Sequence, residues 1–167
     1  MRVRLALAAA LTAGLAAPAG AQTAGCTIEA RSDPPGQVLT CGGGLTIRTE
    51  PGTALGLIDR NRDGRPEGAR LRAKGALIAL PPGQGGFQVL TPHAIAAVRG
   101  TIWAVDVSAG QTSVFVERGR VAVRRPGGPA VLLAEGDGVD VKRGTGPLRV
   151  VRWAPARAAA LLARFGR

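Results

Sequence analysis

The chain has 167 residues, a formal net charge of +11, one His, two Cys and no Tyr. This length fits one domain with its own hydrophobic core. The basic balance alone would favour nucleic acid or anionic surfaces as partners, but an aromatic content of 3% removes the stacking platforms of single-strand binders. One His and two Cys do not supply a transition-metal site of the usual kind. No Gly-x-Ser-x-Gly segment surrounds a serine, so no catalytic triad is predicted.

Residues 1–21 have the pattern of a secretory signal peptide. Two arginines precede an apolar run from Leu5 to Ala17, and a small-residue "AGA" ends at Ala21. The run is too short to span a bilayer, which takes about 20 apolar residues. We therefore expect a mature chain that starts at Gln22, has no further membrane segment, lies in the periplasm or outside the cell, and does not meet nucleic acid. A lipoprotein acylated at Cys26 is the alternative.

Region 22–85 contains both cysteines. Cys26 and Cys41 enclose two strand-like pieces around a turn at residues 33–36. In an oxidising compartment, a pair with this spacing is most simply a structural disulfide. We predict that it ties the base of a hairpin.

A six-residue motif in the same region has the pattern of a calcium loop. "DRNRDG" places oxygen-bearing side chains at Asp59, Asn61 and Asp63 and a turning glycine at position 64, and Glu67 follows as a further ligand. Arg70 stands where a calcium loop has a bidentate glutamate, and three arginines lie beside the site. Calcium binding and an ordinary polar turn therefore both remain open.

The fold class is predicted from short apolar segments separated by glycines and prolines. Because Trp103, Val105 and Val107 alternate with Ile102 and Ala104, both faces of that strand are partly apolar. This favours an all-β domain of short antiparallel strands, as a sandwich or a wound β-stack. The strand-like segments are 44–49, 69–73, 76–80, 86–91, 94–98, 101–107, 111–117, 119–124, 130–134 and 138–142.

The tail, residues 143–167, is basic and ends in a predicted amphipathic helix. Pro155 suits a first helical turn, and an alanine-rich run follows it. Arg157, Arg164 and Arg167 fall on the side opposite the apolar residues. They are candidate contacts for an acidic partner or a membrane surface. In the alternative, the helix caps the sheet with its arginines in solvent.

Residues 86–142 resemble the FecR domain family. The resemblance rests on Thr91-Pro92, on Val98-Arg99-Gly100-Thr101, and on "TSVFVERGRVAV" and "VLLAEGDGVDV". It implies an all-β periplasmic domain. In the iron-citrate regulator that names the family, such a domain passes a signal from an outer-membrane receptor to a sigma factor. Arg99, Gly100 and Thr101 would define the fold: the glycine makes a backbone bend, and the other two make its hydrogen bonds.

The sequence departs from that regulator because it lacks a cytoplasmic segment and a membrane helix. It looks like a stand-alone exported FecR-domain protein, and the family offers no catalytic residues to carry over. The single histidine, His93, is expected in a loop or at a strand edge. We expect a non-catalytic protein-interaction or sensory module of envelope signalling. The alternative is a calcium-stabilised protein that binds an anionic envelope polysaccharide or lipid surface.

Overall fold

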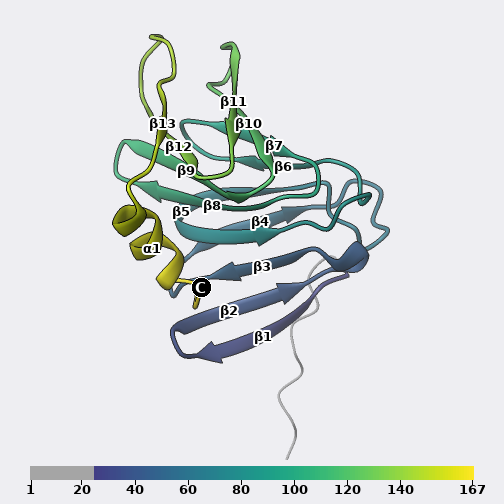
Figure 1. Cartoon of the computed structure of the whole chain (residues 1–167). Coiled ribbons are helices and arrows are strands. Elements are labelled where there is room, and N and C mark those ends of the chain that lie inside the picture. Colours follow the sequence, from purple (N-terminus) through teal and green to yellow (C-terminus); the bar gives the residue numbers. More distant parts are fainter. Residues whose placement is uncertain (1–24) are drawn as a thin grey trace, which may run out of the picture.

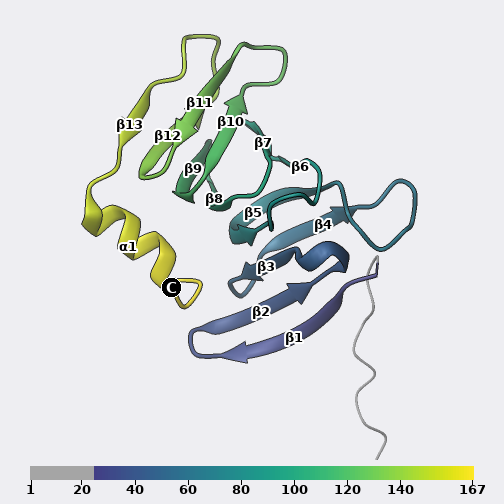
Figure 2. The ribbon, with the colours of Figure 1, turned by 45° about the vertical axis from the view of Figure 1, so that its right-hand side comes forward.

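The computed structural model describes residues 25–167, so the predicted signal peptide lies outside the described residues. A mixed sheet winds into a near-barrel with one short helix against its side (Figures 1 and 2). The strands of this part of the chain are β1 (Thr27–Ser32), β2 (Pro35–Thr40), β3 (Thr46–Thr49), β4 (Ala54–Ile58), β5 (Gly68–Ala79), β6 (Phe87–Leu90), β7 (Ile95–Val98), β8 (Ile102–Ser108), β9 (Gln111–Arg118), β10 (Arg120–Arg124), β11 (Ala130–Ala134), β12 (Asp137–Lys142) and β13 (Val150–Arg152).

The all-β prediction is confirmed, and one long strand explains how the sheet winds. The first half of β5 pairs with β4 and β6, whereas its second half pairs with β3 and β8. Lys74, between the two halves, has a φ of 66°, and the β4–β5 register shifts beside it. The sequence predicted two separate segments, 69–73 and 76–80. A bulge inside one strand reproduces that break without ending the strand.

The other differences concern pairing and short edge strands. The β5–β6 pair is parallel, while every other pair in the described sheet is antiparallel. Strands β4 and β13 had no strand prediction. Strands from region 22–85 and region 86–142 are hydrogen-bonded to each other through β5, so they build one domain.

Two apolar clusters use the two faces of β8. Trp103, Val105 and Val107 are buried in the main core inside the near-barrel, as their alternation predicts. Ala104, on the other face, is buried in a second cluster beneath the C-terminal helix. A strand apolar on both faces is thus explained by a helix that covers its outer side.

The predicted C-terminal helix is present as α1 (Pro155–Ala163). Leu161 and Phe165 are buried against the outer side of the sheet. Trp153, just before the helix, stacks on Phe115 of β9 with ring centroids 5.2 Å apart. The apolar side of the predicted helix is therefore the side that packs.

The predicted disulfide is also present. Cys26 and Cys41 are bonded at 2.04 Å, directly beyond the last pair of the β1–β2 hairpin, Thr27 and Thr40. A disulfide indicates an oxidising, extracytoplasmic compartment. A sulfur in this bond is not available for the thioether of a lipoprotein. Within residues 25–167, no helix has the length and apolar character to span a membrane.

Candidate functional site

The predicted calcium residues lie in the loop between β4 and β5. Gly64 turns the chain there with a φ of 77°, and its amide donates to Asp59 Oδ2 at 3.0 Å. The remaining carboxylate contacts of this loop run from Asn61 Nδ2 to Asp63 Oδ2 at 3.0 Å, from the Arg65 amide to Asp63 Oδ1 at 2.8 Å, and from the Arg60 amide to Glu67 Oε2 at 3.0 Å.

These contacts hold the loop in a closed turn. Asp59 Oδ1 differs, because it is buried and has no hydrogen-bond partner. In residues 25–167, no three side chains of the types His, Cys, Asp and Glu are grouped to hold a metal. Asn61 and backbone carbonyls would have to complete a calcium shell. Calcium binding at this loop stays a prediction.

Arg164 joins α1 to the sheet through two carboxylates. Its guanidinium bonds both oxygens of Glu50, with Nε 3.1 Å from Oε2, and Nη2 lies 2.7 Å from Asp106 Oδ1. The side chains are 34% exposed for Arg164, 16% for Glu50 and 23% for Asp106. Gly75 N–H adds a bond of 2.8 Å to Glu50. The main role of Arg164 is therefore structural: it attaches the C-terminal helix to the sheet.

The two other predicted partner-binding arginines are ion-paired but more open. Arg157 lies over the Trp153 ring at 3.6 Å and bonds Asp140 at 2.6 Å. Arg167 bonds Glu117 at 3.0 Å. Their side chains are 43% and 42% exposed. The helix packs against the sheet, as the capping alternative expects, but each of the three arginines also has an acidic partner on the sheet or beside it. Binding of a partner by these arginines stays a prediction.

These contacts shift the pKa values of the paired carboxylates and of Arg164. Burial by itself raises the pKa of Glu50, but hydrogen bonds from Arg164 and from the Gly75 amide outweigh it, so the pKa lies below its usual value. Burial likewise raises the pKa of Asp140, and hydrogen bonds from Arg157 and Ser113 bring the net pKa below its usual value. The bond to Glu50 raises the pKa of Arg164. Both carboxylates stay ionised at neutral pH.

The turns that suggested the FecR family have structural roles. Thr91 Oγ1 accepts the Ala94 amide at 2.9 Å and so closes the turn before β7. Gly100 has a φ of 62°, and the Thr101 hydroxyl donates to the Arg120 carbonyl at 3.1 Å. The roles predicted for the glycine and the threonine agree with these contacts. His93 lies in the first turn, 8% exposed, with Nδ1 3.3 Å from Thr112 Oγ1.

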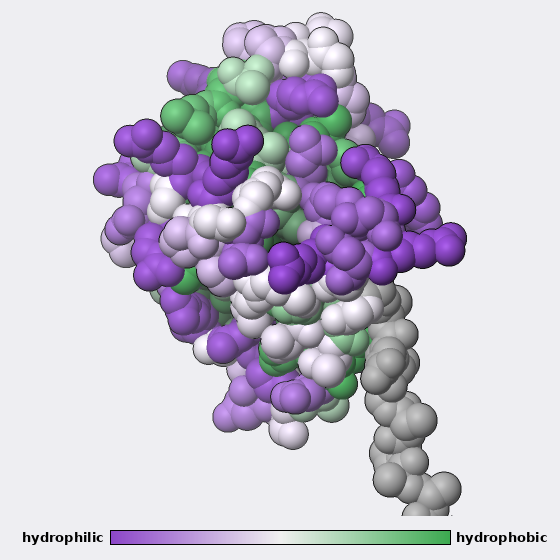
Figure 3. All heavy atoms as spheres, turned by 90° about the vertical axis from the view of Figure 1, so that its right-hand side faces the viewer, coloured by the Kyte–Doolittle hydropathy of each residue, from purple (hydrophilic) through white to green (hydrophobic). Residues whose placement is uncertain are grey.

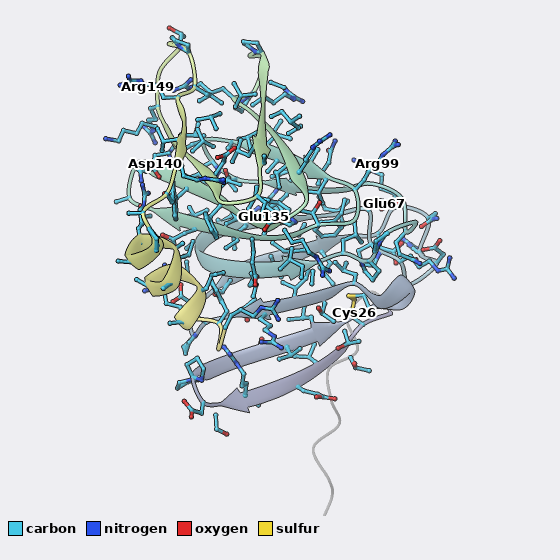
Figure 4. All side chains as sticks on the ribbon, viewed as in Figure 1. Cys26, Glu67, Arg99, Glu135, Asp140 and Arg149 are labelled. Carbon is cyan, nitrogen blue, oxygen red and sulfur yellow. A yellow bond between two sulfur atoms is a disulfide. The ribbon has the colours of Figure 1, made fainter. Side chains whose placement is uncertain are left out.

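Arg99 departs from its predicted role. Its carbonyl accepts the Thr101 hydroxyl at 3.3 Å, but its side chain points outward and lines a surface groove instead of bonding the bend. Figure 4 shows Arg99 and Glu67 on the side of the molecule opposite Asp140 and α1. Sequence spacing gave no sign of this, because the groove is assembled from six strands.

The family comparison agrees with the turn pattern. The model of the family described as FecR protein matches residues 37–122, just over half of the chain. The chain belongs to the FecR family. The match begins in β2, well before residue 86, because β2 to β5 belong to the same sheet as the later strands. Among curated proteins, the comparison found no match.

Two solved structures share the fold, and both are of a candidate anti-sigma factor from Parabacteroides distasonis ATCC 8503. The first has a TM-score of 0.60 at 18% identity and the second 0.62 at 17%. The two matches cover 75% and 82% of this FecR-family chain. The chain in turn spans 59% and 64% of the length of the two solved chains. At this identity, the similarity establishes the fold.

Proposed function

We propose that this FecR-family chain is a non-catalytic protein-interaction module of envelope signalling, located in the periplasm or outside the cell. Its family, its disulfide and its signal-like leader support this placement. The anti-sigma assignment of the two similar structures supports a protein partner. We propose that the partner contacts the free edge of β13.

One observation carries the choice of surface. Strands β11 and β13 are the two ends of the hydrogen-bonded path. The exposed large hydrophobic side chains of residues 25–167 all lie on these two strands: Leu132 at 61%, Val150 at 36% and Val151 at 46%. An edge strand with apolar side chains in solvent is a template for strand addition by another chain.

Charge specifies the partner further. Lys142 ends β12, and Arg143 and Arg149 lie in the loop before β13. No acidic residue follows Asp140 in the chain. These three side chains are exposed. Arg157, which is 43% exposed, lies just after β13. A local positive field steers acidic partners and raises association rates. We therefore propose a partner segment that is extended and acidic.

Photo-crosslinking in the producing cell tests this surface. A photoreactive amino acid replaces Val151, and the matched control replaces Gln37, which is exposed on the inner strand β2. We expect one defined protein to be cross-linked at Val151 and not at Gln37. The double variant Val150→Lys/Val151→Lys should abolish that product, because lysines on an edge strand oppose pairing. Identical products at both positions, or none, would refute the surface.

The alternative function, a calcium-stabilised protein for an anionic envelope surface, is favoured by the unpartnered Asp59 Oδ1. Calcium-dependent sedimentation with anionic vesicles, lost in Asp63→Ala, would support it over the first proposal.

A further inference from the structure

The outer face of β4, β5, β6, β7, β10 and β11 forms an open trough. Directly paired residues in a sheet project to the same face. The registers link one residue from each strand into a single row across the sheet. This row is Ile58, Gly68, Gln88, Ala97, Ala122 and Leu132.

Three of the four middle residues of this row are small, namely Gly68, Ala97 and Ala122, and the fourth, Gln88, is polar and exposed. The row lines a groove of about 530 Å³, with the larger Ile58 and Leu132 at its ends. With strands about 4.8 Å apart, six strands give a trough about 24 Å long. Figure 3 faces this side of the molecule and shows hydrophobic residues set among hydrophilic ones. The trough has the length of a linear chain and not of a compact metabolite.

Arginines flank the trough on both sides. Arg60, Arg99 and Arg120 line it along one side. Arg70 and Arg124 belong to the next row of paired residues on the other side. Of the residues that line the groove, only Glu67 is acidic, and its Oε2 is occupied by a backbone amide.

The charge on this face is not neutralised within the protein. All five ion pairs found in residues 25–167 use arginines of the tail, at positions 152, 157, 164 and 167. The guanidinium groups of Arg60, Arg99 and Arg120 make no ion pair or hydrogen bond within this part of the chain, and all three residues are exposed. Guanidinium groups bind carboxylate and phosphate in planar, bidentate geometry.

We propose that this trough binds a linear polyanionic polysaccharide. Acidic groups along the polymer would pair with the arginine rows, and its sugars would lie over the small-residue floor. An extended peptide fits less well, because it crosses the strands on a sheet face where it has no backbone edge to pair with. A neutral sugar chain would need aromatic platforms, and both Trp side chains are buried. This site is on the sheet face, whereas the proposed protein contact is the edge of β13; the two approach each other only at β11, which lies near β13.

Calorimetry with defined oligogalacturonates tests the proposal, with neutral dextran oligomers of the same length as controls. We expect binding of the acidic oligomers alone, with an affinity that rises with length until the trough is spanned and then levels off. Arg60→Gln/Arg99→Gln/Arg120→Gln should weaken binding about tenfold, as expected from about twofold to threefold for each exposed ion pair. It should also flatten the salt dependence. Arg99→Gln alone should weaken binding about twofold to threefold.

A matched variant removes the same charge from residues that do not line the groove. Lys142→Gln/Arg143→Gln/Arg149→Gln should change the affinity for oligogalacturonate less than about twofold, because none of these side chains lines the groove. Ala122→Phe fills the trough without changing charge and should weaken binding as much as the arginine triple variant. Melting curves check that each variant is folded.

Several outcomes would overturn the proposal. Equal losses in the two triple variants would mean nonspecific charge attraction. Retained binding in Ala122→Phe would place the ligand elsewhere. If polyglutamate binds as tightly as oligogalacturonate, and the same variants abolish its binding, the trough is a peptide site. Phosphatidylglycerol vesicles with that behaviour would make it a lipid site. Absence of binding at low salt would remove the site altogether.

Discussion

Replacing Arg164 by Gln should weaken the attachment of α1 to the sheet. The substitution removes the guanidinium that bridges Glu50 and Asp106 and leaves two carboxylates, 16% and 23% exposed, without their cation. A hydrogen bond to a charged group contributes about 1.5 to 3 kcal/mol when buried, whereas an exposed ion pair contributes at most about 1 kcal/mol. Because Arg164 is 34% exposed, we expect a loss of about 2 kcal/mol in unfolding free energy.

Denaturant unfolding and calorimetry measure this loss. For a chain of this size, about 2 kcal/mol corresponds to a melting temperature lowered by about 7 °C. Arg167→Gln is the matched control: it removes the same charge from a pair 42% exposed and should cost about 0.5 kcal/mol. Glu50→Gln and the double variant complete a mutant cycle, which should return a coupling energy of about 1 to 2 kcal/mol.

The pH dependence of stability gives an independent check that the Arg164–Glu50 contact is stabilising. The folded pKa of Glu50 lies below its usual value of 4.5, so its stabilisation is complete above that pH. It is lost as pH falls from 4.5 through the folded pKa. The difference between the parent and Arg164→Gln should shrink over that window. A cycle with zero coupling, or a difference that does not change down to pH 3, would refute the structural role of this contact.

Two further predictions concern the N-terminal half. Cys26→Ser or Cys41→Ser should lower the unfolding free energy by about 2 to 4 kcal/mol, measured by denaturant unfolding, and free thiols in the alkylated, unreduced parent would contradict the disulfide. If the loop from Asp59 to Gly64 binds calcium, excess Ca²⁺ should raise the melting temperature through mass action, and Asp63→Ala should abolish the rise; an unchanged melting curve at millimolar calcium would leave an ordinary turn.

Local sequence pattern predicted the elements whose cause is local. The hairpin that ends in Cys26 and Cys41, the alternation of Trp103 and Val105 in β8, and the helix that begins at Pro155 all depend on neighbouring residues. β5 was predicted as two segments because Lys74 and Gly75 interrupt its apolar pattern. Only the pairing with β3, β4, β6 and β8 shows that one strand passes through that interruption.

The sequence could not predict the contacts of the tail, because the partner residues are far from it in the chain. Glu50 and Asp106 lie 114 and 58 residues from Arg164, and neither acid stands in a motif. Amphipathic spacing placed the helix arginines away from the apolar side and therefore toward solvent. In the structure, that side meets acidic residues on the sheet. The carbonyls of Arg164 and Phe165 also accept side-chain bonds from Arg31 and Arg48.

Charge counted along the sequence also fails to show where an anion can bind, because it does not show which basic residues form ion pairs in the fold. The sequence counts 22 basic and 11 acidic residues, and the tail contains basic residues but no acid. That count pointed to the tail as the positive surface. Folding reverses much of this, because the ion-paired carboxylates are matched to tail arginines. The arginines left without partners include Arg60, Arg99 and Arg120, which are dispersed in sequence and become neighbours only through strand register. A polyanion should therefore select the sheet face, while the helix that seemed the basic feature of the chain mainly holds the domain together.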